Sequence, residues 1–230
     1  MNLLLLSWGA GAVPGFLAAH TRAGAGPVAV VMIDDAARVL GEPNFSQYER
    51  ERLEGFGCAV TALTAGTLGS ADEFARALDG ADAVYVCGGE TFVLLEALSR
   101  HDMREVLADR VRAGLPYLGL SAGAVIAGPS AEPVTLLDDP GLAPGLTDHR
   151  GLGLIDAVPV PHADGRIPGY PPPVFDRIRA EYAGRYTLAF IDDDQALLVS
   201  GTAAQLVASP DDPRRPTRGD LPADDARLEP

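Results

Sequence analysis

Short apolar runs alternate with helix-like segments up to residue 125, and this alternation constrains the fold more than any other feature. The run Val28–Ile33 is rich in β-branched residues and is closed by Asp34, which is the pattern of a strand buried on both faces. Strands that alternate with helices through short connections predict an α/β fold: a doubly wound, mostly parallel sheet with helices on both faces. We expect its other early strands at Met1–Leu6, Ala59–Leu63, Ala83–Cys87 and Pro116–Leu120.

Helix signals lie between these runs. Ser70–Leu78 begins with a serine that is followed three residues later by Glu73, the spacing of a capping box. Ser46–Phe56 predicts a polar helix with Ser46 as its N-cap and Gly57 at its end. Three more helices are expected, at Phe92–Leu98, Asp102–Ala113 and Val174–Tyr182.

The texture of the chain changes after residue 128. The stretch from Pro129 to Pro173 holds nine prolines before the terminal one and has no regular periodicity. Long irregular stretches in compact domains are usually functional loops or poorly ordered segments. Strands resume at Tyr186–Ile191 and Ala196–Ser200, with a short one near Gln205–Ala208. We therefore expect a single α/β domain over residues 1–208 and a loosely attached tail, rich in Pro, Asp and Arg, over residues 209–230.

Composition excludes several classes of function. The chain has 18 basic and 32 acidic residues, and its net charge of −14 argues against binding to nucleic acid or to an anionic membrane. The apolar start Met1–Leu6 is too short for a signal peptide or a membrane span. Cys58 and Cys87 are typical of reduced core residues in a cytoplasmic protein, and zinc-site spacings are missing. We expect no metal and no cofactor, and the oligomeric state, a homo-oligomer included, stays open.

The segment Gly119–Gly123 reads Gly-Leu-Ser-Ala-Gly and fits the pattern G-x-S-x-G. In that pattern a serine, here Ser121, lies on a sharp turn between a strand and a helix. An apolar strand precedes the turn, and Ala124–Ala127 can open a helix after it. Free N–H groups at the start of that helix would face a developing oxyanion. A plain turn rich in Gly and Ala is the alternative interpretation.

A second glycine turn, Cys87–Thr91, also follows a strand and precedes a helix. The carboxyl ends of parallel strands share one edge of the sheet, where ligands bind. The N–H group of Gly88 or Gly89 would then join that of Ala122 in an oxyanion hole, or the turn is purely structural. A phosphate cradle is disfavoured because the sequence G-x-x-x-x-G-K-[ST] is absent.

A nucleophilic serine needs a base, and the base needs a carboxylate that orients it. Among the histidines, His162 alone follows a short extended run, Ala157–Pro161, and enters a loop. The acidic turn Asp192–Asp194 lies between two predicted strands and would aim a carboxylate at the histidine. Its alternative interpretation is a solvated hairpin turn. The remaining histidines are His20, His101 and His149.

The chain resembles the peptidase E / cyanophycinase family in four segments that occur in the family's order. They are Cys87-Gly-Gly-Glu-Thr-Phe, Gly119-Leu-Ser-Ala-Gly-Ala, Pro161-His162 and Ile191-Asp-Asp-Asp-Gln-Ala196. The resemblance covers roughly residues 1–208. That family is similar in fold to class I glutamine amidotransferases, with serine in place of their elbow cysteine.

The resemblance implies a serine-type peptidase in which Ser121 is the nucleophile and His162 the base. It puts the third member of the triad at Asp193, where the family usually has a glutamate. Because aspartate is one methylene shorter, either the turn lies closer or a neighbour, Asp192 or Asp194, serves instead.

The resemblance also matches Gly89 and Ala122 to the family's oxyanion donors. Glu90 stands where the family commonly has an asparagine. Aspartyl dipeptidases of the family carry a Gly-x-Thr-Arg stretch after the histidine, whose arginine receives the substrate carboxylate. The comparable stretch here, Gly169–Val174, has no arginine, so aspartyl specificity stays open, with two flanking candidates, Arg166 and Arg177.

We therefore expect a serine exopeptidase that hydrolyses short peptides, of dipeptidase or carboxypeptidase type. Proline limits backbone motion, so the stretch from Pro129 to Pro173 would form a stiff cover beside Ser121 that admits only chain ends or short unfolded peptides. The other interpretation is that these prolines only shape a surface loop. Two further functions stay open: a non-catalytic binding or regulatory module, and an amidase or esterase with the same triad.

Overall fold

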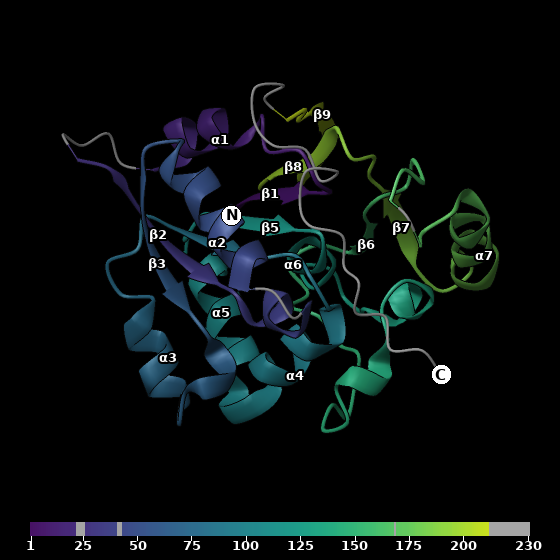
Figure 1. The fold of residues 1–230 in the computed structure, drawn as a ribbon, viewed down its shortest axis with the longest axis horizontal. Coiled ribbons are helices and arrows are strands. Elements are labelled where there is room, and N and C mark those ends of the chain that lie inside the picture. Colours follow the sequence, from purple (N-terminus) through teal and green to yellow (C-terminus); the bar gives the residue numbers. More distant parts are fainter. Residues whose placement is uncertain (22–25, 41–42, 168, 212–230) are drawn as a thin grey trace.

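A mostly parallel sheet forms the centre of the molecule in the computed structural model, which describes residues 1–21, 26–40, 43–167 and 169–211 (Figure 1). The strand order is β3-β2-β4-β5-β1-β8-β9, and β1 to β5 run parallel. β8 pairs antiparallel with β1, and β9 pairs antiparallel with β8. The strands are β1 Asn2–Leu6, β2 Val28–Ile33, β3 Cys58–Leu63, β4 Ala83–Val86, β5 Tyr117–Leu120, β8 Gln195–Ser200 and β9 Ala203–Ala208.

Helices cover both faces of this sheet, as the strand–helix alternation predicts (Figure 1). Successive side chains of a strand point to opposite faces, so Leu4 and Leu6 of β1 pack with α1 and α2, whereas Leu3 and Leu5 pack with α3 to α6. All four leucines are at most 1% exposed, which puts β1 in the middle of the core. The helices are α1 Val13–His20, α2 Pro43–Glu54, α3 Ala71–Ala77, α4 Thr91–Ser99, α5 Met103–Arg112 and α6 Ala122–Val125.

The stretch after α6 builds a small separate layer. The strands β6 (Ala157–Val160) and β7 (Thr187–Phe190) form a two-stranded parallel sheet. Helix α7 (Pro172–Tyr182) covers it through Phe175 and Ile178, and the layer lies beside the central sheet (Figure 1). The short 3-10 helices of the chain are η1 Asp35–Leu40, η2 Ala65–Thr67, η3 Arg100–Asp102, η4 Glu132–Leu136 and η5 Pro140–Leu142.

One local prediction and one alternative interpretation differ from the structure. Helix α2 begins at Pro43, so Ser46 is not its N-cap; the Ser46 hydroxyl instead donates to Asp34 Oδ2 at 3.0 Å. β7 and β8 belong to different sheets, so the acidic turn between them connects the two sheets and is not a hairpin. The cap at Ser70 is confirmed, because its Oγ accepts from the Glu73 N–H at 3.2 Å.

The segment that follows β9 contacts the domain. Ser209 is fully buried, and its hydroxyl donates to the Gly9 carbonyl at 2.7 Å. A domain boundary at residue 208 stays a prediction, and both the tail over residues 212–230 and Pro168 lie outside the described residues.

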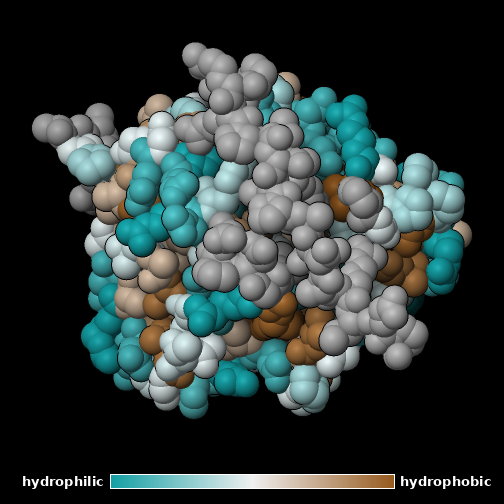
Figure 2. Space-filling view, viewed as in Figure 1, coloured by the Kyte–Doolittle hydropathy of each residue, from teal (hydrophilic) through white to brown (hydrophobic). Residues whose placement is uncertain are grey.

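On the face in Figure 2, hydrophilic residues dominate the rim and hydrophobic ones form small groups between them. Within the described part of the chain, none of the helices has the length and apolar character needed to cross a bilayer.

Close packing at one glycine generates a stability prediction. A Cβ atom at Gly123 in α6 would lie 2.2 Å from the Val86 carbonyl oxygen, so Gly123→Ala forces the backbone of α6 away from β4. We expect the free energy of unfolding, measured in urea, to fall by about 1–3 kcal/mol. The control is Gly15→Ala in α1, where a Cβ meets nothing within 4 Å; it should gain about 0.5–1 kcal/mol. A Gly123→Ala protein as stable as the Gly15→Ala control would contradict this packing.

Candidate active site

Ser121 lies at the carboxyl end of β5, on the turn into α6. Its backbone has φ 47° and ψ −105°, a strained conformation for a residue with a side chain. The Ser121 N–H donates to the Leu6 carbonyl of β1 at 2.9 Å, which holds the turn on the neighbouring strand. The side chain is half-buried, so its Oγ projects from the edge of the sheet as the G-x-S-x-G pattern predicts.

His162 follows β6 and faces this serine. Its Nε2 lies 2.9 Å from Ser121 Oγ, and the residue is 4% exposed. The backbone at His162 is also in the left-handed region, with φ 63°. One face of the imidazole stacks on the Tyr170 ring, with 5.8 Å between centroids. The structure therefore brings together two residues that are 41 positions apart in the sequence.

Asp193 completes a continuous hydrogen-bonded chain. Its Oδ1 lies 2.6 Å from His162 Nδ1, and its side chain is 15% exposed. Of the three aspartates in the acidic turn, Asp193 is the one whose carboxylate contacts the imidazole. The pKa of Asp192 is raised by burial and by the nearby carboxylates of Asp164 and Asp194.

Both glycines of the second turn pack close to the backbone of other segments. A Cβ at Gly88 would lie 3.2 Å from Ser121 Cβ, so this turn adjoins the serine. Gly89 has φ 126°, and a Cβ there would lie 2.1 Å from the Ala36 carbonyl oxygen, so no other residue fits. Ala122 is the first residue of α6, and the first N–H groups of a helix have no partner within it. The predicted oxyanion donors, Gly89 and Ala122, thus lie on the two turns that meet at Ser121.

A partly buried polar cluster adjoins the imidazole of His162. Tyr170, which stacks on His162, donates its hydroxyl to Asp138 Oδ1 at 3.0 Å. The other oxygen of Asp138 accepts from both the N–H and the hydroxyl of Thr91, at the start of α4. Burial raises the pKa of Asp138, although these donors and the nearby His162 oppose the shift. The cluster thereby links α4 to the aromatic ring that stacks on His162.

Glu90 lies next to this cluster. Its Oε2 is buried and has no hydrogen-bond partner among the described residues. Burial first, and the Asp138 carboxylate second, raise the pKa of Glu90 to about 7. Glu90 thus puts a proton-binding group beside Gly89.

The two arginines that flank the segment Gly169–Val174 are exposed and ion-paired. Arg166 is 69% exposed and its Nε lies 3.1 Å from Asp164 Oδ2; Asp164 also accepts from the Asp193 N–H at 3.3 Å. Arg177 lies on α7, is 62% exposed and pairs with Glu181 at 3.3 Å. Arg166 is therefore the one that adjoins the hydrogen-bonded chain, through Asp164.

Sequence reasoning missed Ser7. It is fully buried, its Oγ accepts from the His162 N–H at 2.7 Å, and it donates to Asp193 Oδ1 at 3.0 Å. The usable signal was its position directly after the apolar run Met1–Leu6, because the end of a buried parallel strand is where sites form. Tyr170 and Asp138 carried no comparable signal, since both lie in the irregular stretch.

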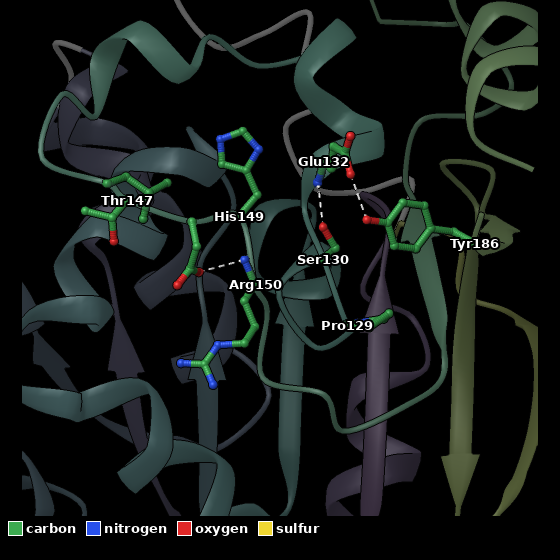
Figure 3. Close-up of a pocket in the computed structure, with 9 residues that line it drawn as sticks. Pro129, Ser130, Glu132, Thr147, His149, Arg150 and Tyr186 are labelled. Atoms are coloured by element: carbon green, nitrogen blue, oxygen red, sulfur yellow. Dashed lines mark hydrogen bonds between the residues drawn. The ribbon is translucent and has the colours of Figure 1, made fainter.

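A separate polar cavity of about 460 Å³ lies on the irregular stretch (Figure 3). The segments 129–132 and 146–150 line it, together with Tyr186. On one side of the cavity the Tyr186 hydroxyl donates to Glu132 at 2.7 Å, and His149 lies on the other side. Ser121, His162 and Asp193 do not line this cavity, so it is distinct from the hydrogen-bonded chain.

Comparison with known proteins gives one consistent result. The model of peptidase family S51 matches residues 18–207. An uncharacterized peptidase of Listeria innocua is 32% identical over 170 residues, covering 74% of this chain and 79% of the relative. A peptidase E of Streptomyces coelicolor is 39% identical over 181 residues, covering 74% of this chain and 67% of the relative.

Solved structures agree. A candidate peptidase E protein of Listeria monocytogenes superposes with a TM-score of 0.76 at 28% identity, over 90% of this chain and 98% of that one. A peptidase from an acI-B1 actinobacterium shares the fold, with a TM-score of 0.64 at 21% identity. The α/β fold and these matches define a serine-type peptidase. The chain belongs to peptidase family S51, the peptidase E family, which confirms the resemblance found in the sequence.

The raised pKa of Glu90 generates a prediction about pH. An acid whose pKa rises from 4.5 when unfolded to about 7 when folded binds its proton more tightly in the folded state. Stability contributed by this proton is present below pH 4.5 and is lost as pH rises to about 7. Glu90→Gln removes this titration. The melting temperature of the variant should therefore rise relative to that of wild type as the pH is raised from 4.5 to about 7. Melting curves whose difference does not change with pH would contradict this.

Proposed function

We propose that this chain is a serine exopeptidase that hydrolyses short peptides, of dipeptidase or carboxypeptidase type. One observation carries the proposal: the hydrogen-bonded chain from Ser121 Oγ to His162 Nε2 (2.9 Å) and from His162 Nδ1 to Asp193 Oδ1 (2.6 Å). A serine becomes a competent nucleophile when a base takes its proton and a carboxylate orients that base. These three residues have the side chains and the order of contacts that this chemistry requires.

In the first half of the reaction, Ser121 Oγ attacks the carbonyl carbon of the scissile peptide bond while His162 Nε2 takes the hydroxyl proton. Asp193 accepts the hydrogen bond from Nδ1–H and stabilises the imidazolium. The N–H groups of Gly89 and Ala122 would bind the negative oxygen of the tetrahedral intermediate. His162 then gives its proton to the leaving amine, the C–N bond breaks, and an acyl-enzyme ester on Ser121 remains.

In the second half, a water molecule replaces the amine. His162 Nε2 takes one proton from the water as its oxygen attacks the ester carbon. The second tetrahedral intermediate breaks its bond to Ser121 Oγ, which regains a proton from His162. The products are a free carboxylate and the original enzyme, so the cycle needs no cofactor.

The stretch between the nucleophile and the base supports the choice of small substrates. Ser130 and Arg150 form an antiparallel β-bridge, and the Leu152 N–H donates to the Ile126 carbonyl at 2.6 Å, so the stretch is tied to the domain at several points. Its prolines further restrict backbone rotation. A fixed wall beside the serine would admit chain ends and short peptides and would exclude folded proteins. A cytoplasmic location also remains part of the proposal.

Variants of the triad test the mechanism. Ser121→Ala and His162→Ala should each lower kcat by on the order of 10⁴-fold or more, because each removes a group that acts in the transition state. Asp193→Asn should lower kcat by about 10⁴-fold, since it favours the wrong tautomer of the imidazole. The measurement is hydrolysis of a panel of short peptides, with amide and ester analogues that would reveal an amidase or esterase.

Two matched controls separate a chemical role from a general loss of acidic charge. Asp192→Asn and Asp194→Asn remove the same charge from the same turn, but neither side chain contacts the imidazole, so both should keep most of the activity. Equal losses for all three aspartates, or a Ser121→Ala protein that cleaves peptides like wild type, would overturn the mechanism. Labelling of Ser121 by a covalent serine probe, lost on heat denaturation, gives an independent measurement.

The size of the substrate has its own test. Incubation with a long unstructured protein should give stepwise loss of residues from one end. Short peptides blocked at the amino end or amidated at the carboxyl end then show which end is attacked. Internal fragments at the earliest time points would contradict an exopeptidase. They would favour the other interpretation, in which the prolines only shape a surface loop.

A further inference from the structure

The carboxyl end of β1 contacts each of the three proposed triad residues. The Leu6 carbonyl accepts from the Ser121 N–H at 2.9 Å. The next residue, Ser7, accepts from the His162 N–H at 2.7 Å and donates to Asp193 Oδ1 at 3.0 Å. Leu6, the last residue of β1, and Ser7, which follows it, therefore contact the proposed nucleophile, base and carboxylate.

The proton of the Ser7 hydroxyl has two acceptors within reach, Asp193 Oδ1 at 3.0 Å and His162 Nδ1 at 3.4 Å. Nδ1 lies 2.6 Å from the same carboxylate oxygen and must carry a proton to donate to it. An Nδ1 that carries a proton cannot accept a second one, so Ser7 donates to Asp193. The Ser7 O–H, the His162 N–H and the Nδ1–H then each have one acceptor, which favours the tautomer whose Nε2 accepts from Ser121.

We propose that Ser7 is a positioning residue for the hydrolysis: it fixes the separation and orientation of His162 relative to Asp193. The inference rests on the proposed triad chemistry. His162 and Asp193 both lie in connections that follow strands of the small β6–β7 sheet, whereas Ser7 directly follows β1 of the central sheet. The Ser7 hydroxyl thereby ties the base and its carboxylate to the sheet that carries the nucleophile.

Burial makes this hydroxyl hard to replace. Ser7 is fully buried, so bulk water cannot supply the two hydrogen bonds that it makes. In Ser7→Ala the His162 N–H loses its acceptor and Asp193 loses a donor. The His162 backbone, which is held at φ 63°, would then be free to relax away from Ser121.

The loop that carries Ser7 is itself held on both sides. The Gly9 N–H donates to the Asp193 carbonyl at 2.8 Å, and Ser209 Oγ donates to the Gly9 carbonyl at 2.7 Å. Arg52, only 3% exposed, donates to the Trp8 carbonyl at 2.7 Å. A support with this many fixed neighbours can hold another residue in place.

The test compares Ser7→Ala with Ser7→Thr, which restores a hydroxyl, and with a matched control, Ser99→Ala. Ser99 also donates one hydrogen bond and accepts one, to Leu95 and from Arg104, at the far end of α4. A base misplaced by a fraction of an ångström slows the chemical step, so kcat should fall about 10–100-fold in Ser7→Ala with little change in KM. Ser7→Thr should recover most of that loss, and Ser99→Ala should keep wild-type kcat.

A second readout does not depend on turnover. The low-field proton resonance of His162 Nδ1–H should be present in the Ser121→Ala protein and should weaken or move when Ser7→Ala is added. If the chain cleaves no peptide but this change occurs, the proposed function fails and the positioning role stands. Ser7→Cys, whose thiol keeps the volume but is a weak donor and acceptor, serves if Ser7→Ala does not fold, and it too should lose turnover.

Three results would overturn the proposal. The first is wild-type kcat in Ser7→Ala, or in Ser7→Cys where that variant replaces it. The second is an unchanged Nδ1–H resonance in the variant. The third is a loss of kcat that Ser99→Ala reproduces, because the effect would then follow from the loss of any serine hydroxyl that donates one hydrogen bond and accepts one.

Discussion

The tight contact between the turn at residues 119–123 and strand β4 is the constraint on which the rest of the site depends. It lets Ser121 adopt φ 47°, a backbone conformation that costs on the order of 1–3 kcal/mol and must be offset by neighbouring contacts. One such contact is the Tyr117 hydroxyl, which donates to the Gly123 carbonyl at 2.6 Å. Backbone packing fixes the position of Ser121, so the fold has only to bring His162 and Asp193 to it.

The small β6–β7 sheet does this. Its strands run parallel, so their carboxyl ends lie at one edge, and the Ile191 N–H donates to the Val160 carbonyl at 2.9 Å just beyond the last paired residues. His162 lies just after the end of β6, and Asp193 lies just after the end of β7. A two-stranded parallel sheet is unusual and weak by itself. Helix α7 stabilises it by burying Phe175 and Ile178 against Val160.

The sequence was most informative where one physical rule dominated. Continuous apolar runs predicted the parallel strands, and small residues around Ser121 predicted its turn. The choice among Asp192–Asp194 depended on tertiary geometry, because three identical side chains in a row carry no local signal. Ser46 illustrates the opposite failure: a good capping residue lies inside α2 because the carboxylate of Asp34 offers its hydroxyl a tertiary partner. The pairing of β6 with β7 joins segments separated by a proline-rich stretch, so periodicity could not reveal it.

The order of the strands also determines when a newly synthesised chain can acquire activity. β1 emerges first, but its sheet neighbours β5 and β8 end only at Leu120 and Ser200, and Asp193 lies between them in the sequence. A ribosome adds roughly 5–20 residues per second, so on the order of ten seconds or more separate the synthesis of β1 from that of β8. Until then Asp193 and His162 cannot assemble with Ser7 and Ser121. A chain with this strand order therefore gains the proposed activity only after β8 has been made and has paired with β1.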